Sequence, residues 1–222
     1  MDKFKINGPS KIRGEVSISG SKNAALPILA ATLLFDKNVT IKNLPRVKDI
    51  DTMLNLLKSL GRKITFKNNK KIATISKGKK NNFFAPYSLV KTMRAGILVL
   101  GPLLAKNKKA KVSSPGGCSI GVRPIDIHLK AISKLGVKIQ IEKGYVNAKA
   151  QKGLVGSEIR FSKISVGATE NLILAACLAN GTTTIKNCAI EPEIKDLTNF
   201  LKTAGAKIKW IGKRTLKIEG VK

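Results

Sequence analysis

The hydrophobic and polar positions of the chain repeat one arrangement three times. Each copy begins with a helix that is apolar nearly all round, predicted at residues 23–34, 93–105 and 169–179. A short strand follows, and then an amphipathic helix with apolar side chains at helical spacing, at residues 50–60, 124–135 and 194–204. Two further strands close each copy. A unit this small cannot bury its own apolar face, so the three copies are expected to share one core.

A glycine marks the end of each amphipathic helix. Gly61, Gly136 and Gly205 are each followed two residues later by Lys-Ile, at roughly 70-residue intervals. Glycine just beyond a helix is the usual C-terminal cap, because it reaches left-handed backbone conformations without strain. The pattern predicts an α/β (α+β) domain over residues 21–222, with repeats at about 23–78, 90–150 and 166–221. Its apolar helices lie buried at the centre, with the sheets and amphipathic helices outside.

The first 20 residues have no counterpart in the other two copies. They read as two short strands, at residues 4–8 and 14–18, joined by a Pro-Ser turn. These leading strands are therefore expected to stand outside the repeat domain.

The charge of the chain narrows the choice of ligands. Lys and Arg number 42 against 13 Asp and Glu, a net charge of +29. Such a charge suits nucleic acid or small anions. The lysines are spread along the whole chain, however, and aromatic residues are 5%, too few for a base-stacking platform. Nucleic-acid binding therefore rests on charge alone, and a phosphate-rich small ligand is the functional interpretation that the charge most readily permits.

The cellular compartment follows from what the sequence lacks. No apolar run approaches the roughly 18 residues of a membrane helix, and the first residues, MDKFK, show no secretory signal. Three cysteines without framework spacing fit reduced thiols. We expect a cytoplasmic protein without a membrane partner, with Cys177 and Cys188 as core residues.

Cys118 lies in the glycine-rich stretch 113–124 (SSPGGCSIGVRP). Gly116 and Gly117 allow a sharp bend that exposes main-chain N–H groups, and Arg123 lies five residues after Cys118. Such surroundings favour the reactive thiolate form. The alternative is an ordinary surface turn with an incidental cysteine.

Five separated motifs together resemble one enzyme family, the UDP-N-acetylglucosamine 1-carboxyvinyltransferases, or enolpyruvyl transferases. They are SGSKNAALP at 19–27, LVKTMRA at 89–95, PGGC at 115–118, RPIDIH at 123–128 and EPEI at 191–194. The resemblance covers the whole chain. It implies an inside-out barrel domain of three repeats, and it implies that this sequence supplies one of two such domains.

The resemblance also implies a reaction. The family transfers the enolpyruvyl group of phosphoenolpyruvate to the 3-hydroxyl of UDP-N-acetylglucosamine and releases phosphate, in the first committed step of peptidoglycan synthesis for the cell wall. No cofactor or metal is implied. The sister activity, transfer to shikimate 3-phosphate, uses the same fold but lacks the PGGC loop and the uracil-binding stretch.

The family's functional residues map onto this chain motif by motif. Cys118 takes the place of the general acid or covalent nucleophile. Lys22, Arg94 and Arg123 would hold the phosphate and carboxylate of phosphoenolpyruvate, and Asn23 would offer its amide to the sugar. The uracil-binding stretch maps to Arg123, Pro124, Ile125, Asp126 and Ile127, and the diphosphate loop to Lys163, Ile164, Ser165, Val166 and Gly167.

Some roles fall to structural alternatives or to the missing half. An exposed helix position is the favoured interpretation of His128, the only histidine. Glu191 and Glu193 fit a structural role at a helix start, where carboxylates favour the helix dipole. The general base and a further phosphate-binding arginine belong, in the family, to the second domain. The expected partners are thus phosphoenolpyruvate, UDP-N-acetylglucosamine and a second domain, which the sequence leaves open as a separate polypeptide.

Overall fold

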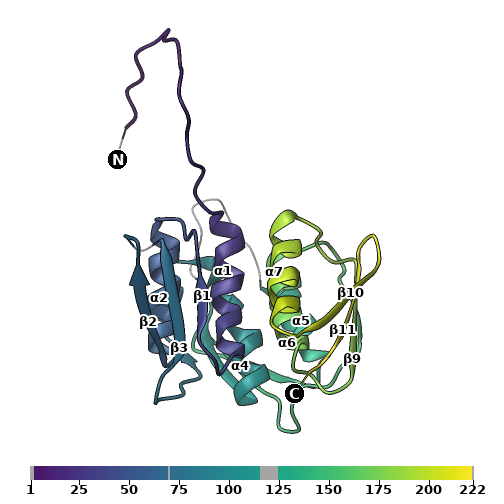
Figure 1. Ribbon diagram of the computed structural model, residues 1–222. Coiled ribbons are helices and arrows are strands. Elements are labelled where there is room, and N and C mark those ends of the chain that lie inside the picture. The colour runs from purple at the N-terminus through teal and green to yellow at the C-terminus, as the bar shows by residue number, and fades with distance from the viewer. Residues whose placement is uncertain (1–2, 70, 116–124, 222) are drawn as a thin grey trace.

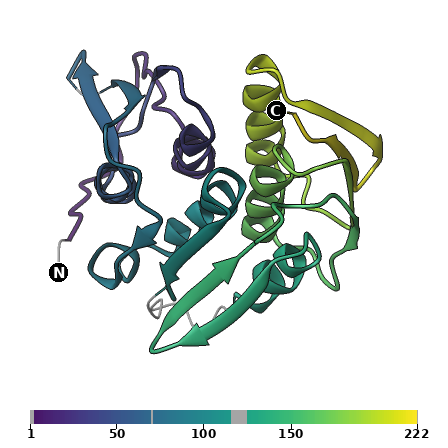
Figure 2. The ribbon, with the colours of Figure 1, turned by 90° about the horizontal axis from the view of Figure 1, so that it is seen from below.

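The computed structural model describes residues 3–69, 71–115 and 125–221. Within these residues the strands form three separate sheets, each accompanied by helices from the same stretch of chain. Helices α1, α6 and α7 lie between the first and third sheets (Figures 1 and 2). The mixed α/β fold expected from the sequence is confirmed, and its described part has three open sheets in place of one closed barrel.

The first sheet has the strand order β1-β3-β2 and is antiparallel throughout. Its strands are β1 (Val39–Ile41), β2 (Arg62–Lys67) and β3 (Ile72–Lys77). The helices of this stretch are α1 (Lys22–Ala31), the 3₁₀ turn η1 (Thr32–Leu34) and α2 (Lys48–Ser59). In α2 the apolar positions Ile50, Met53 and Leu57 are buried, as the helical spacing predicts.

The second sheet has the order β4-β5-β7-β6, with β4 and β5 parallel and the remaining pairs antiparallel. Its strands are β4 (Phe84–Ala85), β5 (Lys109–Ser113), β6 (Lys138–Glu142) and β7 (Tyr145–Lys149). The accompanying helices are α3 (Tyr87–Val90), the 3₁₀ helix η2 (Arg94–Val99), α4 (Leu100–Asn107) and α5 (Asp126–Ser133).

The third sheet has the order β10-β11-β9-β8, with β8 and β9 parallel. Its strands are β8 (Glu158–Arg160), β9 (Thr182–Lys186), β10 (Lys207–Gly212) and β11 (Thr215–Glu219), and its helices are α6 (Val166–Ala176) and α7 (Pro192–Thr203). Gly61, Gly136 and Gly205 have φ values of +94°, +83° and +100°, so the predicted left-handed glycines at the helix ends are confirmed.

Helix α6 is the centre of the core. Every residue from Ala168 to Ala176 is buried, because α1, α4, α5 and α7 all pack against this helix. Gly101 of α4 allows an especially close approach, since a Cβ there would lie 2.4 Å from the main-chain oxygen of Asn171. The predicted buried position of the apolar helix of the third copy is confirmed.

The prediction of one continuous helix at residues 93–105 is wrong. The chain forms a 3₁₀ helix up to Val99 and then begins α4 at Leu100. Pro102 explains the break, because its missing N–H could not donate to the carbonyl of Leu98 in a continuous α-helix. In the first turn of a new helix that donor is not needed.

The predicted leading strands at 4–8 and 14–18 are not formed. Residues 3–20 contain no strand, and their apolar side chains are exposed, Phe4 at 98% and Ile12 at 95%. The segment extends away from the rest of the chain before α1 (Figure 1). A strand needs a neighbour for its main-chain hydrogen bonds, and none of the described sheets runs beside this segment. Among the described helices, none is long and apolar enough to cross a lipid bilayer.

Candidate functional site

A pocket of about 380 Å³ lies where the first turns of α1 and α6 meet the start of η2. Side chains from α2, α5 and α7 complete its wall. The first turn of an α-helix presents N–H groups without helical partners and the positive end of the helix dipole. Two such helix starts at one pocket make it suited to anions, phosphates in particular. The lining residues are Lys22, Asn23, Leu26, Pro27, Asp49, Met93, Arg94, Ala95, Ile97, Leu98, His128, Ser165, Val166, Gly167, Glu170 and Glu193.

The start of α1 is held by a cap and an ion pair. The Ser21 hydroxyl accepts a hydrogen bond from the Ala24 N–H at 3.4 Å, which satisfies one of the free donors of the first turn. Lys22 Nζ lies 3.0 Å from a carboxylate oxygen of Asp49 on α2. Both side chains are partly exposed, so this pair restrains the ammonium group at the pocket and adds little to stability.

The start of α6 is built in the same way. Ser165 caps the helix by accepting from the Ala168 N–H at 3.3 Å. The Thr169 hydroxyl donates to the Ser165 carbonyl at 2.8 Å and accepts from the Ala189 N–H at 3.0 Å. These bonds connect the start of α6 to the loop between β9 and α7. Gly167 has no side chain, and the His128 ring packs so closely that a Cβ there would lie 3.1 Å from the ring.

His128 is buried, 4% exposed, and lies on the pocket wall. The sequence-based expectation of an exposed position is therefore wrong. Its place on the inner face of α5 puts it against α6, where the Asn171 amide nitrogen lies 3.3 Å from Nδ1. Burial, assisted by nearby Arg94, lowers the pKa of His128 to about 4 although Asp126 opposes this. The ring is neutral at pH 7 and, with Nδ1 accepting, carries its proton on Nε2.

Besides Asp49, two further carboxyl groups line the pocket. Glu170 lies on α6, and Glu193 lies in the first turn of α7. Burial, together with the repulsion from Glu193, raises the pKa of Glu170 to about 8. The neighbouring Glu191 has a structural role, since its side chain accepts from the Ile190 N–H at 2.7 Å just before α7.

The structure brings together six of the residues proposed for the site, namely Lys22, Asn23, Arg94, Ser165, Val166 and Gly167. Lys163 and Ile164 precede α6 and are exposed outside the pocket wall. Ile125, Asp126 and Ile127 begin α5 and do not line the pocket, and Asp126 pairs with Lys130 at 3.7 Å. Cys118, Arg123 and Pro124 lie outside the described residues.

Sequence reasoning missed Asp49 and Glu170 and gave His128 and Glu193 to structural roles. His128 had one usable signal, because it directly follows the stretch 123–127. Glu170 had another, because it is a carboxyl in an otherwise apolar helix. No group of three His, Cys, Asp or Glu side chains placed to hold a metal ion occurs in residues 3–69, 71–115 and 125–221.

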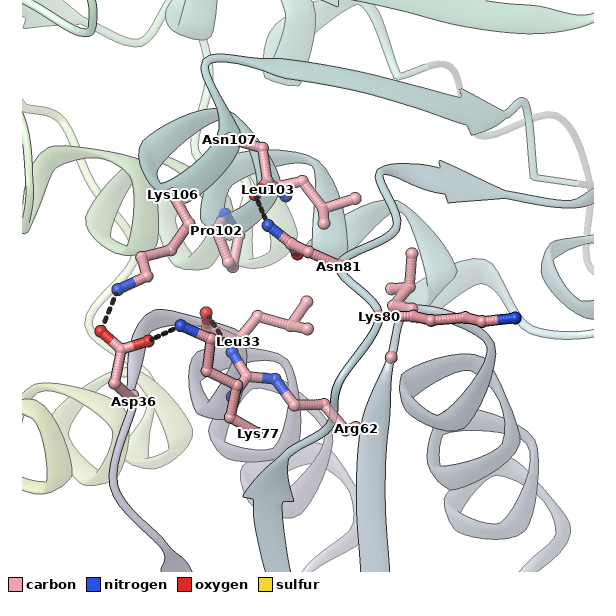
Figure 3. Close-up of a pocket in the computed structure, with 12 residues that line it drawn as sticks. Leu33, Asp36, Arg62, Lys77, Lys80, Asn81, Pro102, Leu103, Lys106 and Asn107 are labelled. Carbon is pink, nitrogen blue, oxygen red and sulfur yellow. Dashed lines mark hydrogen bonds and ion pairs between the residues drawn. The ribbon is translucent and has the colours of Figure 1, made fainter.

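A second pocket, of about 270 Å³, lies beyond the other end of α1 (Figure 3). Its charges are largely paired with one another. Asp36 accepts from both Lys77 and Lys106 at 2.8 Å, which lowers the pKa of Asp36 to about 2, and Arg62 donates to the Leu33 and Phe35 carbonyls at 2.6 and 2.7 Å. Lys80 points away from the other labelled side chains (Figure 3). The second pocket therefore lies at the contact between the first and second stretches of the fold. The anion-suited pocket, at the starts of α1 and α6, is the candidate site.

Comparison with known proteins decides the family. Residues 6–222 match the family model described as EPSP synthase (3-phosphoshikimate 1-carboxyvinyltransferase). The chain belongs to the EPSP synthase family.

Within the EPSP synthase family, the chain is similar to curated proteins named UDP-N-acetylglucosamine 1-carboxyvinyltransferase. It is 66% identical over 221 residues to the protein of that name from Pelagibacter ubique, with 100% of this chain and 52% of the relative covered. Identity is 53% to the protein from Acinetobacter guillouiae, again with 100% and 52% covered. The chain spans about half the length of the curated relatives it matches.

Two solved structures share the fold. The enolpyruvyl transferase NikO from Streptomyces tendae aligns with a TM-score of 0.81 at 22% identity, over 96% of this chain and 50% of that one. EPSP synthase from Acinetobacter baumannii aligns with a TM-score of 0.75 at 19% identity, over 94% and 47%. The predicted enolpyruvyl transferase fold is thus confirmed, again with half of each relative matched.

Cys118 is expected to be the fastest of the three thiols to react with an alkylating agent. Cys177 and Cys188 are buried, and burial raises their pKa values to about 12 and about 11, so both are almost entirely protonated at pH 7.5. Brief treatment of the native protein with iodoacetamide, followed by mass mapping, measures this order. Labelling in denaturant is the control, and equal labelling of all three thiols in the native protein would contradict the prediction.

Proposed function

We propose that this chain is one half of an enzyme that transfers the enolpyruvyl group of phosphoenolpyruvate to the 3-hydroxyl of UDP-N-acetylglucosamine and releases phosphate. The observation that carries the proposal is the anion-suited pocket, which brings together six of the residues that the family resemblance assigns to the site, in a chain 66% identical to a protein named for this activity. The product would enter cell-wall peptidoglycan synthesis, and the site of action would be the cytoplasm.

The geometry supports different binding roles for different residues of the pocket. Lys22 and Arg94 place two cations on its wall, suited to the phosphate and carboxylate of phosphoenolpyruvate. The first turn of α6, with Ser165 and Gly167, offers N–H groups to a second anionic group, the diphosphate of the nucleotide sugar. Asn23, which follows Lys22 on α1 and also lines the pocket, would contact the sugar.

The reaction needs a proton as well as binding. When the sugar hydroxyl adds to the enolpyruvyl carbon, a proton must reach the methylene carbon, and a second group must take the hydroxyl proton. In the proposal Cys118 delivers the first proton or forms a covalent adduct, and Arg123 with residues 124–127 holds phosphate and uracil. The base would come from a second half, in the same polypeptide or another. Residues 21–222 would form the repeat domain, and residues 1–20 would pair with that second half.

The sister activity on shikimate 3-phosphate is the alternative, favoured by the description of the matching family model. Calorimetric titration of the chain with UDP-N-acetylglucosamine and with shikimate 3-phosphate separates the two. We expect heat from the nucleotide sugar, and Lys22→Ala is expected to weaken its binding about tenfold by removing a charged hydrogen-bond donor.

The matched control is Lys58→Ala, an exposed lysine on α2 outside the pocket, which is expected to bind like the unmodified chain. Preference for shikimate 3-phosphate would favour the sister activity. Binding of duplex or single-stranded DNA in place of either ligand would favour a nucleic-acid function.

A further inference from the structure

Glu170 is a buried carboxyl group on the wall of the anion-suited pocket. It lies on the second turn of α6 with 5% of its surface exposed, and it lines the same space as Lys22 and Arg94. In residues 3–69, 71–115 and 125–221 no hydrogen bond or ion pair of its carboxyl group is found, and its oxygens are not among the fully buried atoms without a partner, so the carboxyl group faces the pocket. A buried polar group of this kind is costly unless a ligand or a proton satisfies it.

Charged and titratable side chains reach the pocket wall around Glu170 from α1, α2, η2, α5 and α7. Lys22 on α1 is paired with Asp49 on α2, Arg94 begins η2, and His128 on α5 is neutral above about pH 4. Helix α4 adds no side chain to the pocket wall, and α7 adds Glu193, whose charge opposes that of Glu170. Burial is the larger effect, and the two together keep Glu170 protonated at pH 7.

The charge state of Glu170 decides how the pocket treats an anion. As a carboxylate it would repel a phosphate group at short range. As a neutral acid it carries an O–H donor, and a hydrogen bond from O–H to an anionic oxygen is among the strong ones. A protonated Glu170 therefore suits an anion in this pocket better than its carboxylate form does.

We propose that Glu170 binds the ligand as a neutral acid, donating a hydrogen bond from its carboxyl group to an anionic phosphate oxygen in the pocket. That the ligand bears phosphate rests on the proposed function. The carboxyl group keeps its proton in the complex, and its loss of that proton at alkaline pH places a negative charge against the ligand and weakens binding.

The first experiment follows UDP-N-acetylglucosamine binding by calorimetry between pH 6.5 and pH 9. The unmodified chain is expected to lose about tenfold in affinity across this range, as the donor becomes a carboxylate. Glu170→Gln keeps an N–H donor of similar shape and cannot titrate, so its affinity should stay level. Glu142→Gln on β6, which is exposed outside the pocket, is the matched control and should behave like the unmodified chain.

Glu193→Gln gives a second, independent outcome. It removes the neighbouring negative charge that favours the protonated form of Glu170, so the decline in affinity should move to lower pH. An unchanged decline in Glu170→Gln, or a decline in Glu193→Gln at the original pH, would overturn the proposal.

The second experiment separates this inference from the proposed function. Side-chain carboxyl carbons are followed by NMR during a pH titration with sulfate, and again with chloride at equal ionic strength. Sulfate stays a dianion over this range, so preferential binding to protonated Glu170 must raise its titration midpoint, while the exposed Glu142 stays unchanged. If sulfate raises the midpoint but UDP-N-acetylglucosamine does not bind, the inference stands and the proposed function fails. If sulfate lowers the midpoint or leaves it unchanged, the inference fails.

Discussion

Phosphate release from phosphoenolpyruvate and UDP-N-acetylglucosamine is expected to be at least about 100 times slower with the 222-residue chain alone than with the chain and a second half together. One positioned acid or base contributes a factor of about 100 to 10,000, and in the proposed function the base comes from the second half. Without the second half, the chain would also lack the groups that this half contributes to holding the two substrates in position.

The remaining half of the Pelagibacter ubique relative, expressed separately, is a suitable partner, because that protein is 66% identical to this chain where the two align. Phosphate release is measured with each half alone and with both. Each half alone serves as a control for the other. Turnover by this chain alone within a few fold of the combined halves would contradict the prediction.

Replacing Asn171 by alanine is expected to lower the free energy of unfolding by about 3 kcal/mol. The Asn171 side chain is fully buried on α6, accepts from the Gly101 N–H at 2.7 Å and donates to the Ile97 carbonyl at 2.9 Å. The Gly101 N–H belongs to the first turn of α4, and the substitution removes its acceptor inside the core. Urea unfolding followed by circular dichroism measures the change.

Asn55→Ala is the matched control, because Asn55 is exposed on α2 and its replacement removes no buried hydrogen bond. We expect that variant to unfold within about 0.5 kcal/mol of the unmodified chain. A loss for Asn171→Ala no larger than that of the control would show that water replaces the lost partners of Gly101 and Ile97.

Much of the fold could be predicted from the sequence because apolar spacing is a local property. The amphipathic helix α2 and the glycine after it follow from side chains within a few turns of one another. The break before α4 was missed because a proline permits either a kinked helix or the start of a new one, and the sequence around Pro102 does not distinguish the two. The leading strands were missed because a strand forms against a neighbour, and apolar alternation does not supply one.

The candidate site, like the fold, could be predicted from the sequence only in part. Lys22, Asn23 and Arg94 were found because they lie in short motifs, which a single stretch of sequence displays. Asp49, His128 and Glu170 come from three different helices, and their role depends on how those helices pack. A lone His or Glu in a helix carries no sign of the burial that changes its charge, so the neutral state of both side chains had to come from the structure.

The exposed leading segment has a consequence for how copies of the chain behave in solution. Its apolar side chains, Phe4 and Ile6 among them, are exposed, and its main chain could pair with an unpaired sheet edge of another copy. The net charge of +29 opposes such encounters by mutual repulsion between copies. That repulsion is screened within about 3 Å at 1 M ionic strength, so high salt removes the barrier and strengthens apolar association at once. We therefore expect copies of the chain to associate more readily as the salt concentration rises, because screening weakens the repulsion between their lysines.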